Sequence, residues 1–333
     1  MTAPDGAAPD GRMRLIILGG CLGSGKTTWL RHQLHAKQFS DAFVIVNEAA
    51  ETPVDDALLA RAAGLEVIAG GCVCCSAQAD LIAVLRRLCD QRSQTLSTGQ
   101  RMNQIVLETS GLADPGPIVA AILADPVLVY HILVTEIVVT VDALHALAQL
   151  RTEPLGRRQI ETADRLVLTK VDAVEPAALG RLVATLRQIN PGAALSAAEK
   201  GEATDLPEMV QAVPEDLPDL TGAPQKAPIF PTPLRIGDGI DWTAFSVWLS
   251  ALLHARGDDV VRVKGVVRTP AGRLLLQTVR RVVQAPEILP ETATGDRRED
   301  DIVIVIGRGY RAEDLRRSLR HFAGLPAPGK DCS

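Results

Sequence analysis

A glycine-rich segment near the start of the chain has the residue types and spacing that hold nucleotide phosphates. Residues 20–27 read GCLGSGKT and match the pattern G-x-x-x-x-G-K-[ST] at every fixed position. The apolar run RLIIL precedes this phosphate loop and a helical pattern follows it, so backbone N–H groups and a helix N-terminus would face the phosphates. An ordinary glycine-rich turn is the alternative, but the strand and helix on either side favour a nucleotide site.

Two side chains of the phosphate loop have predicted roles of their own. Lys26 would reach the β- and γ-phosphates, and the Thr27 hydroxyl would bind Mg²⁺. The nucleotide-binding residues predicted in and directly after the loop are Gly20, Gly23, Ser24, Gly25, Lys26, Thr27 and Thr28.

A second segment, GGCVCCS at residues 70–76, has three thiols within four residues. In an extended loop Cys72 and Cys74 point the same way, and thiolates at that spacing bind ions such as Zn²⁺, Co²⁺ or Cu(I). With Cys75 this thiol segment supplies two or three ligands, fewer than the four of a closed structural zinc site. An ion held for transfer fits such a shell, which Glu48, water or a client protein would complete. Buried structural cysteines and redox thiols are the alternatives.

The segment LVLTKVD, residues 166–172, has features that select guanine. The Asp172 carboxylate can accept hydrogen bonds from N1–H and the amino group of guanine, a donor pair that adenine lacks. The stem of Lys170 can lie along the ring face. Thr169 stands where the usual guanine signature has Asn, which weakens the specific support for the loop. The alternative is that Asp172 only caps a helix.

A third acidic position follows another apolar strand pattern, in IVLETSGLADP. In P-loop enzymes an acidic residue at such a strand end holds Mg²⁺, often through water, and a nearby glycine contacts the γ-phosphate. This predicts Glu108 as an Mg²⁺ ligand and Gly111 as the γ-phosphate contact; a solvent-facing Glu is the alternative. Asp142, after the pattern EIVVTV, either faces the same crevice or caps the next helix.

These segments require a scaffold in which strands alternate with helices, and residues 13–200 have that pattern. Continuously apolar strands separated by helices predict a mostly parallel sheet covered on both faces, an α/β P-loop NTPase domain with ligands beyond the carboxyl ends of its strands. Residues 201–228, rich in Pro and acidic residues, are interpreted as a linker. Residues 229–325 predict a small α+β domain, and the two ends, 1–12 and 326–333, are predicted to be flexible.

Composition limits the partners of the chain. It has 333 residues, 47% hydrophobic residues, 3% aromatic residues and a formal net charge of −5, so no global field or stacking surface favours nucleic acid. No apolar run approaches the ~20 residues that span a bilayer, and the N-terminus does not resemble a secretory signal. We therefore expect a cytoplasmic protein with neither a nucleic-acid nor a membrane partner.

The order of these motifs resembles the CobW-like family of P-loop GTPases, proposed metal chaperones and insertases. GCLGSGKTT, VIVNEAAE, GGCVCC, ETSGLADP and TKVD follow one another as in that family, and RVKGVV, LLLQTV and IVIVIGRG resemble its C-terminal domain. The resemblance implies that Glu48 binds the transferred metal and that Asp55 approaches the Mg²⁺ shell or the attacking water. Residues 47–51 read Asn-Glu-Ala-Ala-Glu where the family commonly has Asn-Glu-Phe-Gly-Glu, which predicts altered switching of this loop.

The combined prediction is a GTP-hydrolysing metallochaperone that uses GTP, Mg²⁺ and a transition metal of the zinc or cobalt class. GTP would order residues 48–55 and the thiol segment so that the ion binds, and hydrolysis would release the ion to a client metalloprotein. We could assign no Gln or Arg to orient the attacking water, so turnover is predicted to be slow without a partner. A homodimer is left open. A GTP-binding metal sensor with negligible turnover and, less favoured, a small-molecule kinase are the alternative functions.

Overall fold

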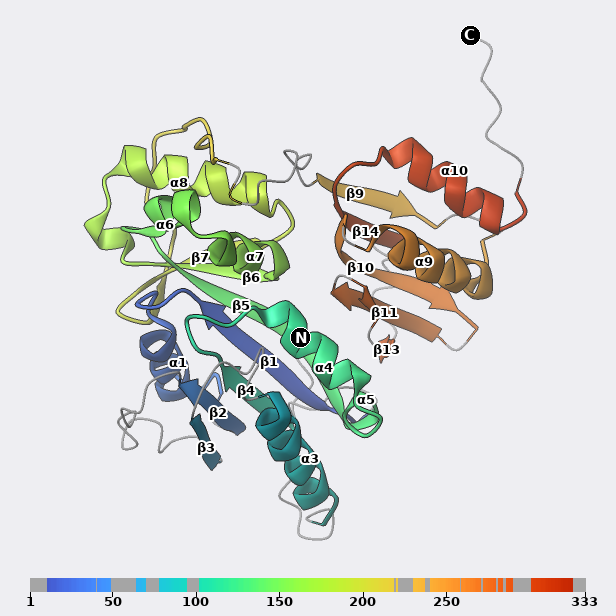
Figure 1. Ribbon diagram of the computed structural model, residues 1–333, viewed down its shortest axis with the longest axis horizontal. Helices are drawn as coiled ribbons and strands as arrows, with labels where there is room; N and C mark the ends of the chain where they lie inside the picture. Colours follow the sequence, from blue (N-terminus) through green and yellow to red (C-terminus); the bar gives the residue numbers. More distant parts are fainter. Residues whose placement is uncertain are drawn as a thin grey trace. The chain divides into compact units, whose positions relative to one another are not determined.

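The computed structural model describes residues 11–39, 41–48, 64–69, 78–94, 102–218, 220, 230–236, 240–257, 259–270, 272–279, 281–283, 286–289 and 301–325. The chain divides into two compact units, Met1–Gln225 and Lys226–Ser333, which are described separately (Figure 1). None of the helices in these ranges is long and apolar enough to cross a membrane.

The first unit is built on an eight-stranded sheet with the order β3-β2-β4-β1-β5-β6-β7-β8. Its strands are parallel except for β8, which pairs antiparallel with β7. The strands are β1 (Met13–Gly20), β2 (Ala42–Glu48), β3 (Gly64–Ala69), β4 (Gln104–Glu108), β5 (Ile132–Asp142), β6 (Arg165–Thr169), β7 (Ala194–Glu199) and β8 (Glu202–Thr204). The chain turns from one side of β1 to the other between β4 and β5. A crevice at the carboxyl end of β1 is therefore the expected ligand site.

Helices cover the sheet because its central strands are apolar on both faces. On one face Trp29, Leu30 and Leu34 of the first helix pack against strand residues that include Val106 and Val138. Another helix, α7, contacts the central strands β1 and β5 and the helices α4 and α8. The helices are α1 (Lys26–His35), α3 (Gln78–Gln94), α4 (Pro115–Ala124), α5 (Leu128–His131), α6 (Ala146–Thr152), α7 (Pro154–Thr162), α8 (Pro176–Ile189) and the 3₁₀ turn η2 (Val171–Ala173).

Of the predicted linker, Glu202–Thr204 form strand β8, and residues 205–218 belong to the first unit and contain neither helix nor strand. The backbone N–H of Glu215 donates to Thr185 Oγ1 of α8 at 2.8 Å. Arg157 Nη1 of α7 donates to the Pro218 carbonyl at 2.7 Å, and Arg151 forms an ion pair with the Glu215 carboxylate at 2.5 Å. These residues therefore form a docked segment on α6, α7 and α8, a contact that their polar composition did not predict.

The second unit is an antiparallel sheet with two helices, α9 (Trp242–Arg256) and α10 (Ala312–Phe322). Its strand order is β12-β11-β10-β14-β9, with β13 beside β11. Phe245 and Trp248 of α9 are fully buried in the core between helices and sheet, and Trp248 Nε1 donates to Ser318 Oγ of α10 at 3.1 Å. The strands are β9 (Phe230–Arg235), β10 (Val260–Thr269), β11 (Gly272–Val279), β12 (Val282–Val283), β13 (Glu287–Leu289) and β14 (Ile302–Gly307). The predicted fold class, a parallel α/β domain followed by an α+β domain, is confirmed.

Candidate functional site

The phosphate loop connects the carboxyl end of β1 to α1 and depends on glycine at its first position. Gly20 has φ 137°, and a Cβ atom there would lie 2.5 Å from the Thr140 carbonyl oxygen of β5. At the other end Gly25 has φ 87° and caps the N-terminus of α1 in the left-handed region. Between them the buried Ser24 places its Oγ 2.7 Å from Thr140 Oγ1. The loop is thus held against β5 while its backbone curves toward the helix.

The Lys26 ammonium lies inside this curve. Its Nζ donates to the carbonyl oxygens of Gly20 and Cys21, each at 3.1 Å, and the residue is 8% exposed. A buried cation at the N-terminus of a helix attracts anions strongly, because the ammonium and the helix dipole act in the same direction. The loop therefore has the charge and shape of a phosphate cradle, with Thr28 exposed in the first turn of α1.

The residues predicted to bind Mg²⁺ lie in contact. Thr27 Oγ1 of α1 donates to Glu108 Oε1 at 2.5 Å, and Glu108 is the buried last residue of β4. A hydroxyl and a carboxylate offer the hard oxygen ligands that Mg²⁺ prefers, beside the loop that would hold the phosphates. The residues present therefore fit this ion.

The loop that follows β4, residues 109–114, lies directly against the phosphate loop. The backbone N–H of Thr109 donates to the Leu18 carbonyl of β1 at 2.9 Å. A Cβ atom at Gly111 would lie 2.5 Å from the Leu22 nitrogen, so only glycine allows this approach. The predicted γ-phosphate contact is therefore next to the phosphate loop, although 89 positions separate Gly111 from Leu22 in the sequence (111 − 22).

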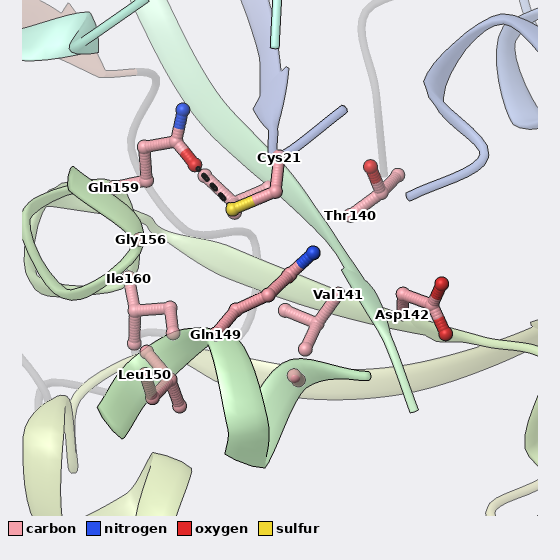
Figure 2. Close-up of a pocket in the computed structure, with 11 residues that line it drawn as sticks. Cys21, Thr140, Val141, Asp142, Gln149, Leu150, Gly156, Gln159 and Ile160 are labelled. Carbon is pink, nitrogen blue, oxygen red and sulfur yellow. Dashed lines mark hydrogen bonds between the residues drawn. The ribbon is translucent and has the colours of Figure 1, made fainter. Parts of the chain in front are cut away.

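Gln159 of α7, which was not among the predicted site residues, joins these two loops. Its side chain is 1% exposed; Nε2 donates to the Ala113 carbonyl at 2.7 Å, and Oε1 accepts from Cys21 Sγ at 3.5 Å (Figure 2). Burial, and then the negative charge of Glu153, raise the pKa of the Cys21 thiol, which keeps it protonated and able to donate. No pattern in the sequence around α7 signals this role, because it depends on tertiary contacts alone.

A small pocket lies between the phosphate loop, β5, α6 and α7. The centre of a water molecule can occupy about 20 Å³ of it, which is room for roughly one water. Gln149 reaches from α6 toward this space, across from Cys21 and Val141 (Figure 2). The pocket is too small for a base or a phosphate group. Of its lining residues, Gln159 contacts the phosphate loop through Cys21.

The predicted guanine segment also contacts the phosphate loop. Thr169 Oγ1, at the end of β6, is within hydrogen-bonding distance of the Ser24 carbonyl at 2.9 Å and the Val141 carbonyl at 3.3 Å. Lys170 has φ 58° and its Nζ donates to the Gly23 carbonyl at 3.0 Å. The hydroxyl that replaces the usual Asn amide thus tethers the phosphate loop to β6.

Asp172 lies inside η2 and is exposed. The N-cap residues of η2 and α8 are Lys170 and Glu175, so Asp172 caps neither helix. The alternative interpretation of Asp172 as a helix cap is therefore wrong. Asp172 is two residues beyond Lys170, at the carboxyl edge of the sheet, where the phosphate loop also begins.

We expect Thr169→Val to weaken GDP binding by about fivefold, because it keeps the shape of the side chain and removes one buried hydrogen bond to the phosphate loop. Thr135→Val is the matched control. Thr135 Oγ1 donates to the Leu15 carbonyl at 3.3 Å, toward the opposite end of β5. Titration with a fluorescent GDP measures both variants; equal affinities for the two would contradict the tether.

Of the predicted ligands of the transferred metal, the structure describes only the backbone of Glu48. Cys72, Cys74 and Cys75 lie outside the described residues, as does Asp55. Glu48 is the last residue of β2, where its Cα partner is Ala69, the last residue of β3. Within the described part of the chain, no three His, Cys, Asp or Glu side chains are arranged to hold a metal ion.

Comparison with known proteins assigns the family. Residues 14–197 match the CobW/HypB/UreG nucleotide-binding domain, and residues 233–323 match the CobW C-terminal domain. Together with the fold and the phosphate loop, these matches define a P-loop GTPase; the chain belongs to the CobW family.

Individual relatives match most of the chain. The zinc chaperone YjiA of Escherichia coli K12 is 30% identical over 323 residues, 93% of this chain and 98% of YjiA. The zinc chaperone CobW of Pseudomonas aeruginosa is 29% identical over 80% of each chain. Zinc-regulated GTPase metalloprotein activator 1 of Schizosaccharomyces pombe is 29% identical over 59% of this chain and 48% of that protein. The crystal structure of Zn(II)-bound YjiA GTPase from E. coli superposes with a TM-score of 0.56 and 23% identity, covering 95% of this chain and 99% of that one.

Proposed function

We propose that this protein is a zinc chaperone in which GTP binding and hydrolysis control the capture and release of the ion. The observation that carries the proposal is the register of three strands at one edge of the sheet. Val46 of β2 pairs with Glu108 of β4, and two residues later Glu48 pairs with Ala69 of β3. Since neighbouring strands are about 4.8 Å apart, Ala69, the last described residue before the thiol segment, is roughly 10 Å from the strand that ends at Glu108.

The nucleotide half of the proposal uses contacts of the described residues. Lys26 and the amides of the phosphate loop would bind the β- and γ-phosphates, and Thr27 and Glu108 would hold Mg²⁺. Bound Mg²⁺ neutralises charge that develops on the phosphates during hydrolysis. Because the Gly111 loop already touches the phosphate loop, it can respond to the presence of a γ-phosphate.

The metal half uses the thiol segment. Cys72, Cys74 and Cys75 would bind the ion with Glu48, and thiolates with a carboxylate suit Zn²⁺. Zinc is favoured over cobalt because YjiA of E. coli and CobW of P. aeruginosa are named zinc chaperones. The incomplete shell leaves a position for a ligand from a client metalloprotein, which would take up the ion. The C-terminal unit is the proposed client-binding part.

The test is a zinc titration of anaerobically purified protein with GTP–Mg²⁺, with GDP–Mg²⁺ and without nucleotide. We expect zinc to bind at least about tenfold more tightly with GTP than with GDP, a coupling of ordinary size between two sites. Cys74→Ala should lose this binding. Cys89→Ala is the control, because Cys89 is 3% exposed on α3 and burial raises its pKa to about 11. If zinc affinity is the same in all three nucleotide conditions, the proposed coupling is wrong and only the GTPase activity stands.

Asp172→Asn should exchange guanine preference for xanthine preference. Xanthine has a carbonyl where guanine has its amino group, so an amide that donates there replaces a carboxylate that accepts. We expect the affinity of the variant for GTP to fall about 100-fold, and its affinity for XTP to exceed its affinity for GTP. Competition against fluorescent GDP measures both, and Asp90→Asn on the exposed side of α3 is the control. Unchanged GTP preference in Asp172→Asn would place the base elsewhere.

A further inference from the structure

Asp142 at the end of β5 is a buried carboxylate, 5% exposed, at the edge of the nucleotide crevice. Its two oxygens make different contacts. Oδ1 accepts the backbone N–H of Leu144 at 3.0 Å, which closes the turn before α6. Oδ2 accepts from Lys170 Nζ at 2.6 Å and lies 2.9 Å from His145 Nδ1. The carboxylate therefore performs one task within its own turn and another across the site.

Lys170 is unusual in both its backbone and its side chain. A non-glycine residue at φ 58° occupies the left-handed region, which is sparsely populated and kept only where surrounding contacts impose it. Its ammonium bridges the Asp142 carboxylate and the Gly23 carbonyl of the phosphate loop. With its backbone fixed between β6 and η2 and its ammonium held by Asp142 of β5, the four-carbon stem of Lys170 has little freedom left.

We propose that Asp142 is a positioning residue for the guanine base, acting through Lys170. A free lysine side chain loses rotamer entropy when it is ordered. Asp142 orders the Lys170 stem before the nucleotide binds, so the free energy of base binding does not include this entropy loss. The inference rests on the proposed contact of the Lys170 stem and Asp172 with the base.

The charge state of Asp142 is consistent with this role. Burial raises the pKa of the carboxyl, but hydrogen bonds from Lys170, His145 and the Leu144 amide outweigh it and hold the pKa below its ordinary value. The carboxylate is thus ionised at neutral pH and pairs with the lysine cation. The N-cap residue of α6 is His145, so the interpretation of Asp142 as a cap of that helix is wrong. The turn that Asp142 closes has no need of the ion pair, because an amide oxygen accepts the Leu144 N–H equally well.

Three variants separate the positioning role from the turn contact with Leu144 and from the base contact. Asp142→Asn keeps an oxygen for the Leu144 amide and removes the charge. Lys170→Met keeps an apolar stem and removes the tethered ammonium. Lys170→Ala removes the stem as well. Dissociation constants are measured for GTP and GDP, together with kcat at saturating GTP and Tm; His145→Gln serves as the control on the exposed partner of Asp142.

We expect Asp142→Asn and Lys170→Met each to weaken GTP and GDP equally, by about tenfold, because the base is common to both nucleotides. Combining the two changes should add no further loss, since both remove the same tether. The kcat at saturating GTP should fall less than the affinity does, since the base contact is the same in the ground state and in the transition state. His145→Gln should bind as the wild type does.

Wild-type affinity in Asp142→Asn and Lys170→Met, with a loss only in Lys170→Ala, would overturn the positioning role and leave the base site in place. Additive losses in the double variant would also overturn it. Wild-type affinity in Lys170→Ala would overturn both the positioning role and the proposed base site. If Asp142→Asn does not fold, Lys170→Met still decides the question. The Lys170 side chain is 39% exposed, so the fold tolerates the change, and the change removes the same ion pair.

Discussion

Lys26→Met should lower kcat/KM for GTP by at least about 100-fold, the scale seen when a donor to a developing charge is removed from an active site. The Lys26 ammonium lies 3.1 Å from the Gly20 and Cys21 carbonyls, inside the curve that would receive the β- and γ-phosphates. Methionine fills a similar volume but brings no charge and no donor. Phosphate release under multiple turnover measures the change.

Thermal unfolding without nucleotide provides the control for Lys26. The hydrogen bonds from the ammonium to the Gly20 and Cys21 carbonyls are local to the phosphate loop, so we expect the Tm to shift by only a few degrees. Lys264→Met, on an exposed position of β10 in the second unit, should leave kcat/KM unchanged. Turnover within about threefold of wild type in Lys26→Met would mean that the phosphates bind at another place on the molecule.

Gly111→Ala should lower kcat by about 50-fold while GDP affinity changes by less than about threefold. A Cβ atom at this position would lie 2.5 Å from the Leu22 nitrogen and 2.7 Å from its Cα. Backbone atoms cannot move aside as a flexible side chain can, so the loop of residues 109–114 must shift away from the phosphate loop. The shift would remove the contact between this loop and the γ-phosphate, which GTP has and GDP lacks.

Gly156→Ala is the matched control for Gly111→Ala. Gly156 is on α7 beside the same site, but a Cβ atom there would lie 3.4 Å from Cys21 Sγ, the margin of ordinary contact. The substitution should leave kcat unchanged and stabilise the helix slightly, because alanine is the better helix former. Equal losses of GTP and GDP affinity in Gly111→Ala would show that the loop supports the whole phosphate loop and does not respond to the γ-phosphate.

The sequence predicted those parts of the site that depend on strand ends. In a parallel sheet all carboxyl ends meet at one edge, so the residues after β1, β4 and β6 had to lie near one another. Glu108 at the end of β4 indeed contacts Thr27 of the phosphate loop, and Thr169 at the end of β6 contacts the Ser24 carbonyl of the same loop. The fold class followed from the same alternation of apolar strands with helices.

Contacts made by side chains from other elements were not predictable from periodicity. Gln159 is one polar position on the buried side of α7, and its bonds to Cys21 and Ala113 arise from how that helix packs. Thr169 was expected to weaken the guanine segment as a substitute for Asn, yet its hydroxyl lies within hydrogen-bonding distance of the Ser24 carbonyl. Such roles depend on which backbone group lies within about 3 Å, which no local pattern records.

The measurement that tests the account most directly follows zinc and phosphate release together in one GTP turnover. Protein loaded with equimolar zinc and GTP is mixed with Mg²⁺, a zinc-binding dye and a phosphate sensor. If hydrolysis controls release, zinc should reach the dye with the rate constant of phosphate release, and a non-hydrolysable GTP analogue should retain it. Zinc that leaves before hydrolysis, or remains bound after all GTP is consumed, would contradict a GTP-controlled zinc chaperone.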